Sequence, residues 1–295
     1  MENKVCILLA AYNGEKYISQ QFDSILNQKD VDVDIYVSVD RSEDETLNLV
    51  KEYQSTFKNI YLLPYGERFG GAGKNFYRLI LDVNFSKYSY VALSDQDDIW
   101  LDDKISCAID EILTNKVSGL SSAVTAFWAG GHQKKIDKSA KQTSHDHFFE
   151  SPGPGCSFVL SKDLAIAFKT FLNEHDTLDI DYHDWLIYAF SRANNFEWYI
   201  SRKSKMMYRQ HENNQIGANS GFFSILRRLK MIRSGWYRCE IIKIISILNL
   251  NDNISKYIIK RTYLSNLKLI FKVTRLRRKS SEQFLLACFL FLNVF

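Results

Sequence analysis

The first hundred residues alternate between apolar runs and segments in which apolar residues recur at helical spacing. The runs that predict buried strands are 4–12, 33–40, 59–65 and 88–94. The segments that predict helices are 15–26, 43–53 and 75–83. Strands that alternate with helices predict an α/β fold, with a mostly parallel central sheet covered by helices on both faces.

The second half of the chain is less regular. Apolar runs that predict strands are 121–128, 155–161 and 197–202, and the segment 181–193 predicts a helix. The polar stretch 130–150 predicts a loop, and residues 208–221 are rich in Asn and Gly. The remainder is expected to be helical and basic. No run of 18 or more apolar residues occurs in the sequence, so we expect no bilayer-spanning helix.

Charge is distributed unevenly along the chain, although the total is only +4. Residues 1–201 contain 19 Lys and Arg against 30 Asp and Glu, whereas residues 202–295 contain 19 against 4. An acidic body suggests a site that uses a cation, and a basic tail suggests an anionic partner. The five cysteines are scattered and never form a C-x-x-C pair, which argues against a disulfide framework or a zinc site and fits a reducing compartment.

The segment LSDQDDIW (93–100) contains three carboxylates directly after a predicted strand. Ligands of parallel sheets gather beyond the carboxyl ends of the strands. Residues i and i+2 at a strand end point the same way, so Asp95 and Asp97 could hold one divalent cation, with Asp98 close by. Carboxylate ligands suit Mg²⁺ or Mn²⁺. The alternative is an acidic start to the helix expected from about residue 102, on a solvated surface.

Two further segments follow strand ends in the first half. Asp40, in VSVDRSEDET, could accept hydrogen bonds from a nucleobase or ribose, or could simply cap the next helix. The segment GERFGGAGKN (66–75) fails the Walker pattern of phosphate-binding loops. We interpret its glycines as a turn beside the site, with Lys74 or Arg68 available to a phosphate; a plain loop is the alternative.

Two candidates come from the second half. An acid in DYHDW (181–185) could act as general base for a hydroxyl nucleophile, although acids are also common where a helix starts. His211, in YRQHENN, could be a third metal ligand or a donor to a diphosphate, whereas most lone loop histidines are neither.

In this order, these segments resemble the family 2 inverting glycosyltransferases of the GT-A fold. The resemblance covers about residues 4–217 and rests on four segments: ILLAAYNGEKYISQQFDSIL, VDRSEDET, SDQDDIWLDDK, and HDW followed by YRQHENNQIG. The last of these is most similar to the bacterial rhamnosyltransferase branch, with related O-antigen and capsule enzymes. Val39 and Arg41 depart from the usual D-D-G nucleotide segment, which affects how base and ribose would be recognised.

The resemblance implies a Rossmann-like nucleotide-binding half and a catalytic domain at 1–217. The charge and apolar spacing of the remaining residues predict a basic, amphipathic helical region at 218–295. It implies transfer of rhamnose, another deoxyhexose or a hexose from a nucleotide-diphosphate sugar to a hydroxyl of a lipid-linked or growing polysaccharide acceptor. Direct displacement would invert the anomeric carbon. A nucleotidyltransferase and a non-catalytic membrane-surface protein that binds sugar nucleotides are the alternatives; the first would release diphosphate and the second would turn over no donor.

Carried over to this sequence, the resemblance implies a role for each matching residue. Asp184 would deprotonate the acceptor hydroxyl. Asp95 and Asp97, with His211, would hold Mn²⁺ or Mg²⁺, which stabilises charge on the leaving diphosphate. The nucleotide-sugar site would comprise Ala11, Tyr12, Asn13, Asp40, Lys74, Asn75, Asp95 and Gln96.

The basic C-terminal region predicts contact with an anionic membrane surface. Apolar residues of 222–232 alternate with Arg227, Arg228, Lys230 and Arg233, as in an interfacial helix. The apolar end 284–295 is too short to span a bilayer. Lys272, Arg275, Arg277, Arg278 and Lys279 are expected to meet headgroups. We therefore expect a cytoplasmic protein, peripheral on the inner face of the cell membrane, with no nucleic-acid partner; helices that pack on the catalytic domain or form a homodimer are the alternative.

Overall fold

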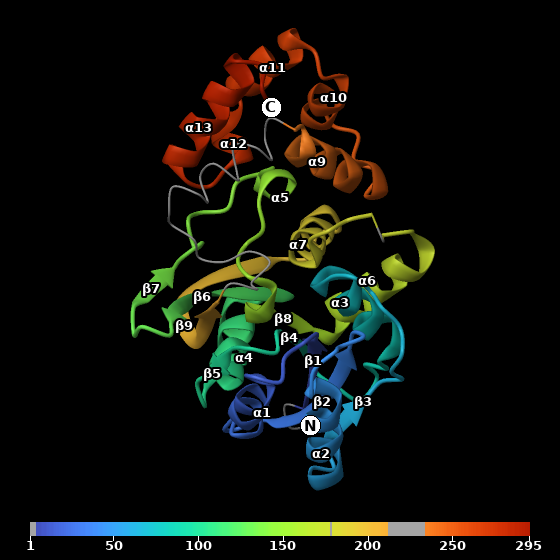
Figure 1. Cartoon of the computed structure of the whole chain (residues 1–295). Helices are drawn as coiled ribbons and strands as arrows, with labels where there is room; N and C mark the ends of the chain where they lie inside the picture. Colours follow the sequence, from blue (N-terminus) through green and yellow to red (C-terminus); the bar gives the residue numbers. More distant parts are fainter. Residues whose placement is uncertain (1–3, 178, 212–233) are drawn as a thin grey trace.

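The structure is a computed structural model that describes residues 4–177, 179–211 and 234–295 (Figure 1). Its strands are β1 (Lys4–Ala11), β2 (Asp32–Val39), β3 (Ile60–Leu62), β4 (Tyr90–Ser94), β5 (Ile99–Trp100), β6 (Gly119–Trp128), β7 (Gln133–Ile136), β8 (Val159–Ser161) and β9 (Trp198–Gln210). Its helices are α1 (Ile18–Leu26), α2 (Thr46–Thr56), α3 (Ala72–Asp82), α4 (Lys104–Asn115), α5 (Asp146–Phe149), α6 (Lys162–Glu174), α7 (His183–Ala193), α9 (Trp236–Ile247), α10 (Asn253–Lys260), α11 (Tyr263–Ile270), α12 (Val273–Leu276) and α13 (Ser280–Phe291), with a 3₁₀ turn at Gly155–Ser157.

All the described strands belong to one sheet, ordered β3-β2-β1-β4-β8-β6-β9-β5, with β7 paired to β6. Strands β3, β2, β1 and β4 are parallel neighbours, and β6 and β9 run in the same direction as they do. Six of the nine strands in the described ranges therefore share one direction. This confirms the predicted α/β fold with a mostly parallel sheet.

Helices cover both faces of the sheet because side chains of a strand alternate between its faces. Even-numbered residues of β1 from Cys6 to Ala10 pack into one core with α3, α6 and α7. Odd-numbered residues from Val5 to Leu9 pack into a second core with α1, α2 and α4. The apolar run of β1 lacks alternation because both of its faces are buried.

The parallel register brings the ends of β1, β2 and β4 to one edge of the sheet. Ala11 is opposite Val39, and Leu9 is opposite Ser94. The next residue, Asp40, donates its backbone N–H to the carbonyl of Ala11 over 2.8 Å. The predicted site residues that follow these strands are therefore neighbours.

Three parts of the second half differ from the sequence prediction. The predicted loop 130–150 contains β7 and α5. Only Val159–Ser161 of the predicted strand 155–161 is a strand, because the segment after Pro154 first forms a 3₁₀ turn. Strand β9 extends from the predicted 197–202 region to residue 210, since its later residues pair with both β6 and β5.

The C-terminal helices form a group that packs on α5 and α7 (Figure 1). Ile241, Ile244 and Leu276 share one continuous core with residues of α5 and α7. The predicted helical extension is therefore confirmed. The expected boundary between residues 217 and 218, and Arg227, Arg228, Lys230 and Arg233, lie outside the described residues. Within the described ranges, no helix combines the length and hydropathy needed to cross a bilayer.

Two residues predicted to meet lipid headgroups point into the protein instead. Arg278 forms ion pairs of 3.0 Å with both Asp146 and Glu150. Arg277 pairs with Glu282 and donates to the carbonyl of Phe149. The prediction for these two residues was wrong because buried carboxylates require charged partners, and a run of basic residues does not reveal which members supply them.

Candidate active site

The turn that follows β4 carries the acidic residues. Ligand atoms of Asp95, Asp98 and Cys156 all lie within 4.8 Å of one another. Asp98 is buried, and its Oδ1 accepts a hydrogen bond from the backbone N–H of Arg209 over 3.1 Å. Asp97 Oδ2 lies 2.6 Å from His211 Nε2. The structure therefore brings Asp97 and His211 into contact, and places Asp95 against Asp98 and Cys156.

Negative charge is concentrated at this turn. Burial, followed by repulsion from Asp97, raises the pKa of Asp95 to about 7. The same two causes raise the pKa of Asp98 well above its usual range. Carboxylate oxygens suit Mn²⁺ or Mg²⁺, and a divalent cation would offset the repulsion. The residues present therefore fit a divalent metal.

The turn after β1 is held against the acidic turn by Gln96. Its amide accepts from the backbone N–H of Tyr12 and donates to the carbonyl of Tyr12, each over 2.7 Å. Gly14 permits this approach, because a Cβ there would lie 2.2 Å from Gln96 Oε1. Asn13 joins the same turn to the one after β2, since its N–H donates to Ser42 Oγ over 3.0 Å.

Two predicted nucleotide-binding residues hold loops together below the surface. The carboxylate of Asp40 accepts from the backbone N–H groups of Arg41, Phe69 and Gly70, which fixes the glycine-rich loop against the end of β2. Asn75 is buried, and its amide donates to the carbonyl of Ser38 over 3.0 Å. Both shape the site in this structure, and their direct contact with a nucleotide stays a prediction.

Asp184 lies in the first turn of α7 and is partly buried. Its Oδ1 accepts from the backbone N–H of Trp185 over 2.8 Å. Loss of solvent raises the pKa of Asp184 to about 6, against the lowering effect of a hydrogen bond from Ser151. The charge of Asp184 in turn contributes to raising the pKa of Asp95, so the two carboxyl groups interact electrostatically. The other acid of the motif, Asp181, is exposed.

The structure also reveals neighbours of the site that sequence reasoning missed. Arg209 donates Nε–H to the carbonyl of Asp97 over 2.8 Å, and its guanidinium stacks on the ring of Tyr17 at 4.3 Å. The position of Arg209, two residues before His211, could have indicated its place beside the site, because side chains two residues apart on a strand point the same way. Cys156 and Ser151 belong to no motif, so no pattern of residues indicated their place beside the site.

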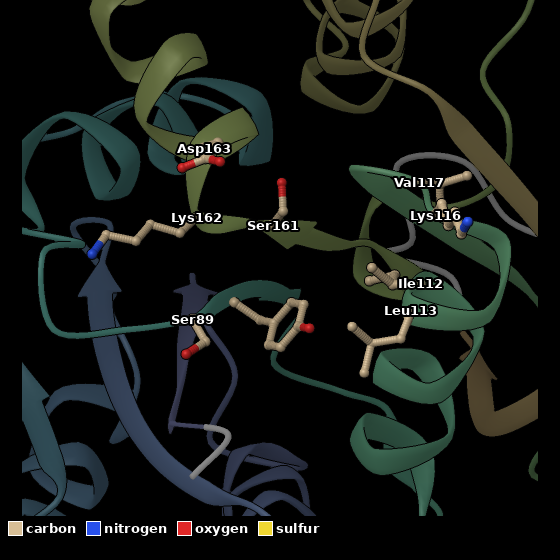
Figure 2. Close-up of a pocket in the computed structure, with 9 residues that line it drawn as sticks. Ser89, Ile112, Leu113, Lys116, Val117, Ser161, Lys162 and Asp163 are labelled. Carbon is tan, nitrogen blue, oxygen red and sulfur yellow. The ribbon is translucent and has the colours of Figure 1, made fainter. Parts of the chain in front are cut away.

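Two surface grooves lie away from this site. One, of about 370 Å³, lies between the end of α4 and the start of α6 (Figure 2). It includes Ser89 and Tyr90, at the start of β4, whereas Asp95 follows the end of that strand. The other, of about 350 Å³, lies near Asp34 in β2. Neither groove includes an acidic-turn residue.

Comparisons with known proteins agree with this geometry. A model of the family Glycosyl transferase family 2 matches residues 6–171. The dTDP-rhamnosyl transferase RfbG of Shigella flexneri is 45% identical over 290 residues, which are 97% of this chain and 100% of that protein. An Escherichia coli protein, the UDP-Glc:alpha-D-GlcNAc-diphosphoundecaprenol beta-1,3-glucosyltransferase WfgD, is 27% identical over 62% of this chain and 68% of its own length. Among solved structures, S. aureus TarS 1-349 in complex with UDP-GlcNAc superimposes with a TM-score of 0.58, at 18% identity, over 86% of this chain and 70% of that chain.

Proposed function

This chain belongs to glycosyl transferase family 2, and we propose that it transfers rhamnose from dTDP-rhamnose to a hydroxyl of a lipid-linked saccharide. The observation that carries the donor assignment is the 45% identity to a dTDP-rhamnosyl transferase across both the catalytic fold and the C-terminal helices. The acidic turn and Asp184, brought to one edge of the sheet, supply the groups that such a transfer needs.

Asp95, Asp97 and His211 are the residues that would hold a divalent metal, with Asp98 beside them. When bound, Mn²⁺ or Mg²⁺ stabilises the negative charge that develops on the departing nucleoside diphosphate. Gln96 fixes the turn after β1 beside the acidic turn, and Asp40 fixes the glycine-rich loop. These contacts preorganise the donor side of the site, which reduces the free energy needed to orient the substrate.

Asp184 is the proposed general base. A sugar hydroxyl is a poor nucleophile until a neighbouring carboxylate removes its proton. A carboxyl pKa of about 6 leaves Asp184 ionised at neutral pH yet more basic than an exposed aspartate. The activated oxygen attacks the anomeric carbon from the face opposite the diphosphate, and the configuration at that carbon is inverted.

The donor assignment is tested by turnover of a set of sugar nucleotides in the presence of isolated membranes of the source organism. We expect dTDP-rhamnose to release nucleoside diphosphate faster than UDP-glucose, UDP-GlcNAc or GDP-mannose. The reaction should require Mn²⁺ or Mg²⁺ and stop with EDTA. Faster turnover of one of the other donors would overturn the choice of rhamnose while leaving a glycosyltransferase in place.

A lipid-linked acceptor is consistent with the surface of the C-terminal helices. Large apolar side chains are exposed there, among them Phe271 at 89% and Phe284 at 72%. The exposed basic residues between 256 and 279 are Lys256, Lys260, Arg261, Lys268, Arg275 and Lys279. Apolar and basic side chains on one group of helices suit an anionic bilayer surface. The E. coli relative is named for an undecaprenol-linked acceptor, which supports the same proposal.

Membrane docking predicts that the full-length protein floats with anionic liposomes at low salt and less at high salt, because headgroup attraction is screened. Replacing Phe271 and Phe284 by Asp should abolish flotation, since both are large apolar side chains exposed on the C-terminal helical group. The matched control is Leu113→Asp, an exposed apolar residue on α4. A wild-type protein that stays with the aqueous fraction at low salt would contradict docking and favour the alternative of a homodimer.

A further inference from the structure

We propose that Arg278, which lies between α12 and α13, is a positioning residue for the reaction. It holds the segment 146–155 against the first turn of α7 and so fixes the orientation of Asp184. The inference rests on the proposed role of Asp184 as base. It gives the C-terminal helices a part in catalysis that is separate from membrane binding.

Arg278 contacts the segment at three successive points. Its side chain is 1% exposed. Nη1 donates to Asp146 Oδ2 over 3.0 Å, and Nη2 donates to the carbonyl of Ser151 over 2.6 Å. Nη2 also lies 3.0 Å from Glu150 Oε2, while the backbone N–H of Arg278 donates to Glu150 Oε1 over 2.8 Å. One residue of the C-terminal region thus fixes both ends of 146–151.

The held segment leads directly to the proposed base. The Ser151 hydroxyl donates to the carbonyl of Gly153 over 2.7 Å, and its interaction with the Asp184 carboxyl lowers the pKa of that group. Further along, the backbone at Gly155 is so close to α7 that a Cβ would lie 2.3 Å from His183 Nε2 and 3.3 Å from Asp184 Cβ. A shift of this segment would therefore be transmitted to Asp184.

The buried carboxylates that contact Arg278 make the position of the segment 146–155 depend on this arginine. Asp146 is fully buried and receives Arg278 on one oxygen and Arg192 on the other. Glu150 is also buried, with Arg278 as its nearest cation at 3.0 Å and Arg277 at 3.8 Å. Loss of the Arg278 contacts leaves two buried carboxylates with weaker compensation of their charge, a cost that movement of the segment would relieve.

Movement of the segment has a specific chemical signature. The ionisable groups that interact electrostatically with Asp184 are Asp95 after β4 and Tyr77 on α3, and Ser151 is the polar side chain of the segment that affects its pKa. The Ser151 hydrogen bond lowers the pKa of Asp184, so its loss raises that pKa above about 6. Because the base must be ionised, the acid limb of the rate profile then moves to higher pH.

The test compares Arg278→Lys with Arg202→Lys in the same purified full-length protein. The first change keeps the charge but loses the planar fork that reaches three acceptors. The second makes the same change on an exposed side chain of β9, away from the proposed bilayer surface. The measurements are transfer from dTDP-rhamnose into isolated membranes as a function of pH, binding of dTDP with Mn²⁺, and thermal stability.

We expect Arg278→Lys to lower kcat about 10- to 100-fold, the scale of loss when a catalytic group is misplaced. Its acid limb should shift upward while dTDP binding stays unchanged, and Arg202→Lys should match wild type. Ser151→Ala should reproduce the shifted limb without disturbing the buried ion pairs, and it decides the question if Arg278→Lys does not fold.

Unshifted acid limbs in Arg278→Lys and Ser151→Ala would overturn this inference alone. If Arg278→Lys is only less stable, with wild-type kcat and acid limb per folded molecule, its role is structural and the inference fails. An active Asp184→Asn variant would overturn the proposed base and this inference together, so the two failures are distinguishable.

Discussion

Replacing Asp97 by Asn is expected to reduce donor turnover by roughly two to three orders of magnitude, the scale seen when a group that stabilises developing charge is removed. The change preserves the shape of the side chain and removes one negative charge. Asp97 Oδ2 lies 2.6 Å from His211 Nε2, so both proposed ligands are affected at once. Asp95→Asn should have a similar effect, because the carboxylate of Asp95 lies in one cluster with Asp98 and Cys156.

The decisive readout is metal binding rather than activity alone. Titration of Mn²⁺ by electron paramagnetic resonance, with and without dTDP, should show weaker binding in both variants than in wild type. Asp110→Asn, which removes an exposed carboxylate from α4, is the matched control and should bind Mn²⁺ normally. Unchanged Mn²⁺ affinity and Mn²⁺ dependence in both variants would show that the metal is held elsewhere.

Replacing Asp184 by Asn is expected to lower transfer by about 10²- to 10⁴-fold, the contribution of a general base. Binding of dTDP with Mn²⁺ should be retained, because the base acts on the acceptor. In the wild-type protein, the rate should fall as pH drops below about 6, since the pKa of Asp184 is raised to about 6 and only the ionised form accepts a proton. This acid limb should be absent from the residual activity of the variant.

Asp181→Asn is the control for this experiment. Asp181 belongs to the same motif but is exposed, so its loss should leave transfer largely intact. An inactive Asp181→Asn protein beside an active Asp184→Asn protein would mean that the other acid is the base.

The regular half of the fold could be predicted because its signals are local. Apolar runs and helical spacing located β1, β2, β4 and their intervening helices, since both faces of these strands are buried. The place of Asp95 follows from the same logic, because parallel strands end at one edge. The start of helix α6 could also have been predicted, because Ser161 is followed by apolar residues at helical spacing. In the structure, the Ser161 side chain caps the helix by accepting a hydrogen bond from the N–H of Leu164.

The remaining features depend on contacts between distant parts of the chain. The two-residue strand β5 exists only because Ile99 and Trp100 pair with β9. Cys156 reaches the acidic turn through a Pro- and Gly-rich segment with no periodicity. Arg278 and Asp146 are separated by 132 residues, so their ion pair has no local pattern. For the same reason, Arg278 could not be distinguished in the sequence from its basic neighbours, and it was predicted to be exposed as they are.

The most direct test of the proposed rhamnosyl transfer is its stoichiometry, measured with dTDP-rhamnose that is labelled in the sugar. Purified protein, isolated membranes and Mn²⁺ are incubated together, and labelled lipid, dTDP and inorganic diphosphate are measured. We expect one dTDP to be released for each rhamnose that enters the lipid fraction, without release of inorganic diphosphate. The reaction should stop in EDTA and recover when Mn²⁺ is added. Release of diphosphate instead of dTDP would indicate nucleotidyl transfer, and an absence of labelled lipid with any sugar nucleotide would contradict a glycosyltransferase that acts on a lipid-linked acceptor.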